Sequence, residues 1–198
     1  IDWLEGKYIY YSYQPHLVAV SSYSAIFSNQ NIQKTKDFMF VRFNAESAGN
    51  ILYSVYKIGG VDDSQGNYSL FNIDFAQFIR GDIDIRFFNF VDENNSFAYR
   101  VFAGAGLPYS NSTALPFEKR YFSGGANSIR AWQVRNLGPG SFRDTSMSHY
   151  PNQTADIKLE VNFEYRFKMF WLLEGAVFVD AGNIWAITKN DERQGSHP

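Results

Sequence analysis

Residues 157–167 read IKLEVNFEYRF, and apolar and polar side chains alternate at every position of this stretch. A period of two places successive side chains on opposite faces of a β-strand. Strands of soluble domains usually run about 5 to 6 residues, whereas a tilted strand that crosses a membrane needs about 9 to 11. The stretch therefore predicts a long strand between an apolar and a polar environment. The polar side chains are Lys158, Glu160, Asn162, Glu164 and Arg166.

Several other segments show the same alternation over a similar length. In the segment 72–90 the charged residues share one face of the predicted strand, and isoleucine and phenylalanine occupy the other. The aromatic stretch 8–27 is interrupted by Pro15, so it could form one bent strand or two. Together the segments predict an all-β chain of about six to eight strands. The further alternating segments are 38–47, 97–106 and 171–182.

The connections between these segments differ in length. Residues 92–96 and 168–170 are short, whereas residues 48–70 and 107–153 are long. Short turns at one end and long loops at the other are typical of outer-membrane barrels. Ordered domains seldom contain unstructured connections longer than about 12 to 15 residues, so we expect the loop 107–153 to be folded. Its predicted packing residues are Phe117, Tyr121 and Phe122.

The composition excludes several classes of protein. The chain has 198 residues, 18% aromatic and 19% charged, a net charge of -2 and no cysteine. Lysine and arginine are not clustered, so nucleic acid is not expected as a partner. No apolar run reaches the roughly 18 residues of a membrane helix. The three histidines lack metal-ligand spacing, and no nucleotide or nucleophile motif is present. We therefore expect no metal, no cofactor and no enzymatic activity.

The long loop carries the most specific signal. Residues 115–142, LPFEKRYFSGGANSIRAWQVRNLGPGSF, resemble the sixth extracellular loop of the BamA/TamA family of outer-membrane assembly barrels. The loop sequence is most similar to that of the Bacteroidetes branch of the family. Residues 160–167 and 178–185 resemble the two strands that follow that loop in the family. The loop tip departs from the family pattern at one position, because alanine replaces glycine. The tip residues are Ile129, Arg130, Ala131 and Trp132.

The resemblance implies that the loop folds back into the barrel interior, where Arg130 meets Glu164 and Asp180. The alternation supports this independently, because both carboxylates fall on the charged faces of their strands. A guanidinium between two carboxylates can form bidentate, charge-assisted hydrogen bonds that hold the loop in place. Two plainer interpretations stay open: a surface lid with an incidental salt bridge, and carboxylates that are merely solvated in a polar lumen.

The two strands after the loop give a directly testable arrangement. We expect residues 154–167 and 171–182 to form an antiparallel hairpin. Phe163 and Tyr165 should face lipid, and Glu160 and Glu164 should face the lumen. A slip of one residue in the pairing would reverse these faces.

Barrels of this family have sixteen strands, and the matched motifs belong to the later ones. We therefore expect residues 1–198 to be part of one transmembrane barrel domain, with periplasmic domains and the final strands outside this chain. An open half-barrel in lipid would leave unpaired backbone groups at two edges. A complete eight-stranded barrel is the alternative.

The resemblance implies an insertase in the outer membrane of a Gram-negative bacterium. Such a protein helps nascent β-barrel proteins or other translocated proteins into the lipid bilayer, by edge-strand templating at a weak seam and by local thinning. Periplasmic or outer-membrane accessory subunits are the other expected partners. The alternatives are a secretion or translocation pore of the same superfamily and a plain structural or porin-like barrel.

Overall fold

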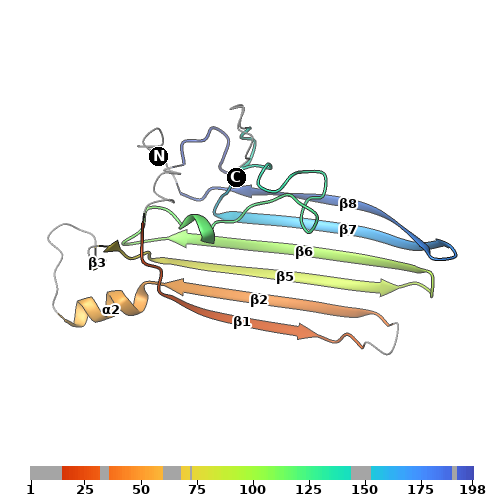
Figure 1. The fold of residues 1–198 in the computed structure, drawn as a ribbon, viewed down its shortest axis with the longest axis horizontal. Coiled ribbons are helices and arrows are strands. Elements are labelled where there is room, and N and C mark those ends of the chain that lie inside the picture. Colours follow the sequence, from red (N-terminus) through yellow and green to blue (C-terminus); the bar gives the residue numbers. More distant parts are fainter. Residues whose placement is uncertain (1–14, 32–35, 60–67, 72, 144–152, 189–190) are drawn as a thin grey trace.

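The computed structural model describes residues 15–31, 36–59, 68–71, 73–143, 153–188 and 191–198. Within these residues, six strands of 9 to 14 residues form one antiparallel sheet in the order β1-β2-β5-β6-β7-β8 (Figure 1). The fold is therefore all-β and corresponds to part of a barrel wall, as the alternation predicted. The strands are β1 (Val20–Ser28), β2 (Phe38–Ala48), β5 (Phe78–Phe90), β6 (Asn95–Pro108), β7 (Ile157–Phe170) and β8 (Leu173–Trp185).

The pairing register keeps side chains of one kind on each face of the sheet. Asn162 of β7 lies opposite Arg100 of β6 and Asp180 of β8, so polar side chains form a continuous row on what we call the inner face. On the outer face, Phe97 of β6 packs against Phe163 and Tyr165 of β7, with ring centroids 5.8 and 5.0 Å apart. This separation follows from the period of two along every strand.

The predicted hairpin is confirmed. β7 and β8 pair antiparallel, with Glu160 opposite Gly182 and Glu164 opposite Phe178. Phe163 lies on the outer face opposite Val179, which is 64% exposed. Broad exposure of apolar side chains on one whole face is what a lipid-facing wall requires.

The two ends of the sheet differ, as Figure 1 shows. At the turn end, short turns at residues 91–94 and 171–172 join β5 to β6 and β7 to β8. At the loop end, long connections follow β2 and β6. The first contains α2 (Asn50–Ile58) and the two-residue strands β3 (Ser69–Leu70) and β4 (Ile73–Asp74). The second contains the 3₁₀-helix η2 (Phe117–Lys119).

Three predicted boundaries are wrong. Residues 72–90 do not form one strand, because β5 begins at Phe78 and Phe75 is fully buried beside Tyr56 and Tyr68. The backbone at Ala76 instead donates a hydrogen bond to Leu17. The Phe75 side chain thus packs against the connection between β2 and β5. This tertiary contact overrides the alternation of apolar and polar residues in the sequence.

The turn predicted at residues 168–170 is also misplaced. β7 continues to Phe170 through a bulge, and the turn falls on residues 171–172, with φ of 55° at Trp171. The hairpin thus runs longer than the charged alternation suggested. The connection after β6 spans residues 109–156 rather than 107–153, because β6 continues to Pro108 and β7 begins only at Ile157.

Buried apolar side chains lie mainly where the loop-end connections cover the inner face. Phe102 and Ile184 from the sheet pack with Tyr121 and Ala155 from the connection between β6 and β7. This core therefore joins the sheet to the loop, and it holds the loop in position. Among the described residues, no helix is long and apolar enough to cross a membrane.

Candidate functional site

Tyr121 anchors the loop to the inner face. Its backbone pairs with Ala155 through two hydrogen bonds of 2.8 and 2.9 Å. Its hydroxyl donates to the carbonyl oxygen of Gly81 at 2.9 Å, and the Arg80 guanidinium lies 4.3 Å from the ring centroid. Burial raises the pKa of the Tyr121 hydroxyl, so this group remains a hydrogen-bond donor at physiological pH.

The space for Tyr121 comes from a glycine in β6. A Cβ atom at Gly104 would lie 2.7 Å from the Tyr121 ring. No other residue type fits without displacing that ring. The glycines of residues 97–106 were predicted only as strand residues, and the structure gives this one a role in seating the loop.

The other two predicted packing residues lie nearer the loop surface. The Arg135 guanidinium lies 4.7 Å from the ring centroid of Phe117 and 4.9 Å from that of Phe122. Phe122 is 36% exposed, so it is not part of the core beneath the loop. The three aromatic residues thus have different contacts. Tyr121 packs against the sheet, whereas Phe117 and Phe122 enclose the Arg135 guanidinium within the loop.

The loop tip turns back on itself at two glycines. Gly124 and Gly125 adopt φ of 96° and 97°, and the Gly125 N–H donates to the carbonyl of Trp132 at 2.8 Å. Ile129 is buried, whereas Ala131 and Trp132 are exposed. The φ angle of Ala131 is not positive, so its Cβ causes no strain and the replacement of glycine is tolerated.

Arg130 lies between the two predicted carboxylates. Its Nε and Nη2 atoms donate to Asp180 at 2.8 and 2.7 Å, and its backbone N–H donates to the same carboxylate at 3.0 Å. Its Nη1 atom donates to Glu164. The guanidinium also stacks on the Phe178 ring, 3.6 Å from the centroid. The structure thus brings together all three residues that the resemblance paired.

Electrostatics hold this arrangement in one protonation state. The hydrogen bonds that Arg130 donates to Asp180 raise the pKa of its guanidinium, and the one that it donates to Glu164 acts in the same direction. Arg130 therefore stays charged at any pH the protein meets. A charged guanidinium with a planar fork matches a carboxylate in two places at once, which lysine cannot do.

A second set of polar contacts extends the site toward β6. Glu160, which is 1% exposed, accepts hydrogen bonds from Ser123 and Ser128 of the loop and contacts the Lys158 amine at 2.9 Å. Asn162 donates to the carbonyl of Ser128 and to Asp180, both at 2.9 Å. Sequence reasoning placed Glu160 and Asn162 on the charged face but did not assign them loop partners. Their alternation with Glu164 was the available signal.

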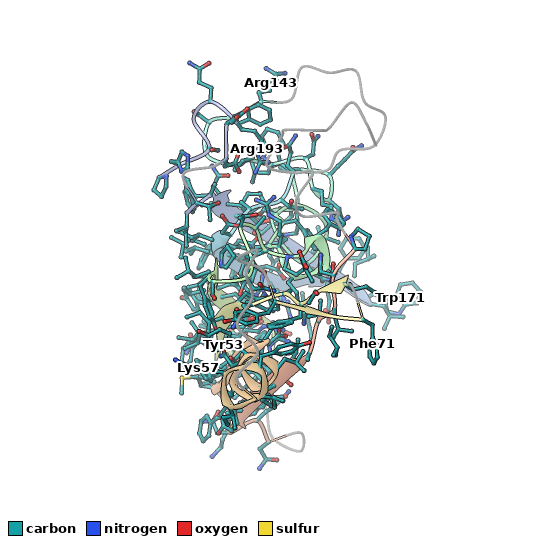
Figure 2. The ribbon with its side chains drawn as sticks, turned by 90° about the vertical axis from the view of Figure 1, so that its left-hand side faces the viewer. Tyr53, Lys57, Phe71, Arg143, Trp171 and Arg193 are labelled. Carbon is teal, nitrogen blue, oxygen red and sulfur yellow. The ribbon has the colours of Figure 1, made fainter. Side chains whose placement is uncertain are left out.

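A third contact closes the loop end. Arg193 donates to Asp191 at 2.8 Å and to the carbonyl of Thr154 at 2.9 Å, so it ties the segment after β8 to the start of β7. Burial favours the neutral form of Asp191, but the hydrogen bonds and charge of Arg193 outweigh it and lower its pKa. Figure 2 shows Arg193 among other side chains, whereas Arg143 projects at the margin of the molecule.

The arrangement is suited to fixing a conformation. Among the described residues, no group of three or more histidine or acidic side chains could hold a metal ion. The site instead consists of a loop arginine and loop hydroxyls bonded to carboxylates on two adjacent strands. Breaking or forming these bonds would release or seat the loop on the inner face.

The comparison with protein families fits this geometry. The family model of the Omp85 superfamily domain matches residues 31–197. No curated protein matches the chain. Proteins of the Omp85 superfamily are outer-membrane proteins that insert or translocate other proteins. With a match over most of its length, this chain belongs to the Omp85 superfamily.

Proposed function

We propose that this chain forms part of the barrel wall of an assembly factor. This factor inserts nascent β-barrel proteins into the outer membrane of a Gram-negative bacterium of the Bacteroidetes type. It acts without enzymatic chemistry and without a cofactor. Its partners are nascent barrel proteins, the lipid bilayer and accessory subunits. The loop is the element whose position the protein must control.

The observation that carries this proposal is the seating of the loop by Arg130 on Asp180 and Glu164. Arg130 binds carboxylates on β7 and β8, which are neighbouring strands of the wall. The position of the loop is therefore coupled to the arrangement of these two strands. An element with two discrete positions, seated and released, is what a cycle of substrate entry and release needs.

The polar core under the loop also favours an assembly role over a permanently open pore. Tyr121 and Ile129 are buried, and Glu160 is bonded to the loop hydroxyls. Packing of this kind costs free energy to undo, so the lumen beside β6 to β8 opens only when the loop moves. A porin-like barrel has a water-filled interior instead.

Reconstitution of the protein in lipid vesicles tests the function. Urea-unfolded outer-membrane barrel proteins are added, and their folding is followed by the shift in electrophoretic mobility of unheated samples. The vesicles with protein should fold the barrels faster than empty vesicles, and Arg130→Ala should remove most of that acceleration.

Arg143→Ala is the matched control, because Arg143 is an exposed arginine of the same loop. It should fold barrels at the wild-type rate. Folding rates that are equal in vesicles with and without the protein would contradict the assembly role. If the protein also exported a secreted polypeptide, its role would be secretion.

A further inference from the structure

A cavity of about 650 Å³ lies beside the Arg130 site on the inner face. Side chains from β2, β5, β6 and β7 and from the loop line it, and Glu164 supplies the acidic group among them. A cavity wall of this composition has an excess of guanidinium groups. Its arginines are Arg42, Arg86, Arg100, Arg130 and Arg166.

Asp84, which pairs with three of these arginines, lies beneath them. The Asp84 side chain is 0% exposed and contacts Arg86 at 2.9 Å, Arg100 at 3.0 Å and Arg42 at 3.5 Å. By contrast, the side chains of Arg42 and Arg166 are 38% and 52% exposed. The cavity therefore meets these guanidinium groups while the charge of Asp84 stays behind them, and Glu164 is the acidic group that reaches the lining.

The ion pairs around the cavity contain more positive than negative groups. They join six cations to four carboxylates, which leaves a surplus of two positive charges. In a concave site with low-dielectric walls, such a surplus attracts anions. The cations are Arg42, Arg86, Arg100, Arg130, Lys158 and Arg166, and the carboxylates are Asp84, Glu160, Glu164 and Asp180.

An apolar cavity of about 400 Å³ adjoins the cationic one toward the turn end and shares Arg86, Phe88 and Arg166 with it. The Arg86 guanidinium lies 5.4 Å from the Phe40 ring centroid, and that of Arg166 lies 5.9 Å from Phe88. Inner faces of barrels are generally polar, so phenylalanines here need another reason. The remaining aromatic side chains of this wall are Phe38 and Phe90.

We propose that the cationic cavity binds a phosphate group through Arg42, Arg86 and Arg166. Planar guanidinium forks match phosphate oxygens in pairs. These three arginines line one cavity and share only two carboxylates, Asp84 and Glu164. The phosphate comes from the free anion or from a phospholipid headgroup, whose acyl chains the phenylalanine wall would cover. This binding site is independent of the proposed assembly role, since it needs no protein substrate.

Two substitutions test the site without leaving a buried carboxylate unpaired. Arg42→Gln leaves Asp84 bonded to Arg86 and Arg100, and Arg166→Gln leaves Glu164 bonded to Arg130. The purified protein in a non-ionic detergent is titrated with inorganic phosphate by calorimetry, with chloride added to keep the ionic strength constant. Each substitution should weaken phosphate binding about tenfold, and the double variant about a hundredfold.

Arg143→Gln is the control, because Arg143 is an exposed arginine of the loop that does not line this cavity. It should keep wild-type phosphate affinity. Circular dichroism and the mobility of unheated samples verify that every variant is folded.

A parallel titration with dihexanoyl phosphatidic acid, below its micelle concentration, identifies the source of the phosphate. Binding about tenfold tighter than that of inorganic phosphate assigns the site to lipid headgroups, and equal binding assigns it to free phosphate. Absence of saturable binding by either probe overturns the proposal. So does binding that is unchanged in the double variant.

Discussion

The ring of Tyr121 occupies the space above Gly104 that a side chain at that position would fill. The two residues belong to the loop and to β6, and their contact lies directly under the loop that Arg130 pins. The seat of the loop therefore depends on the absence of a single methyl group in the sheet.

Gly104→Ala should loosen the loop while leaving the barrel inserted. Overpacking of this kind costs about 1–3 kcal/mol, and the Tyr121 ring is the group that must move. Cleavage of the loop by proteinase K on intact cells measures the effect, and we expect a rise of several-fold. Gly81→Ala is the control, since a Cβ there would meet only Asn44 at 3.5 Å. Equal cleavage of the two variants would show that the Tyr121 contact does not hold the loop.

Arg130→Ala should expose the loop to proteinase K and lower assembly of outer-membrane proteins, because it removes the guanidinium that binds the loop tip to Asp180 and Glu164. Arg130→Lys should be almost as poor, since lysine lacks the bidentate fork. The measurements are loop cleavage and the steady-state level of outer-membrane proteins. Wild-type values for both in Arg130→Ala cells would make the ion pair incidental.

The two carboxylates should not be equivalent. Asp180 accepts from two guanidinium nitrogens and from the backbone N–H of Arg130, whereas Glu164 accepts from a single nitrogen of Arg130 and is also bonded to Arg166 at 2.5 Å. Hydrogen bonds to charged groups contribute about 1.5–3 kcal/mol each. Asp180→Asn should therefore accelerate loop cleavage more than Glu164→Gln does. The reverse order would mean that Glu164 is the principal anchor.

The contact between Asp191 and Arg193 should make the loop end sensitive to acid. The pKa of Asp191 is lower in the folded protein than in the unfolded chain, so its stabilisation is complete above the unfolded value of about 3.9. It is lost as the pH falls through the folded value. The protection factors of the backbone amides of residues 153–156, which correct the exchange rates for their intrinsic dependence on pH, should be lower at pH 3 than at pH 6 in the wild type. Asp191→Asn should show faster exchange already at pH 6. An unchanged exchange rate at that pH would show that the contact between Asp191 and Arg193 does not stabilise the loop end.

A charge on the outer face should prevent insertion. Val179 lies near the middle of β8 and is 64% exposed on that face. Arginine at such a position costs about 2–4 kcal/mol near the bilayer midplane. Val179→Arg should lower the amount of folded protein recovered in the outer-membrane fraction, and Val179→Leu should leave it unchanged. Normal recovery of the arginine variant would contradict a lipid-facing assignment of this face.

Much of the wall could be predicted because strand alternation is a local property. The period of two in residues 157–167 placed Glu160 and Glu164 on one face and Phe163 on the other, and the paired register shows the same division. The break before β5 could not be predicted this way. Phe75 continues the alternation in the sequence, but burial against Tyr56 and Tyr68 withdraws it from the sheet.

The sequence by itself determined the strands, their two faces and the arginine at the loop tip, since each depends on the order and spacing of neighbouring residues. Tertiary structure alone decided that Tyr121 rests on Gly104, that Ser128 meets Glu160, and that the arginines of separate strands outnumber their carboxylates around one cavity. These contacts join residues distant in the chain. Only the folding of the loop onto the sheet brings them within bonding distance, and no local pattern encodes that meeting.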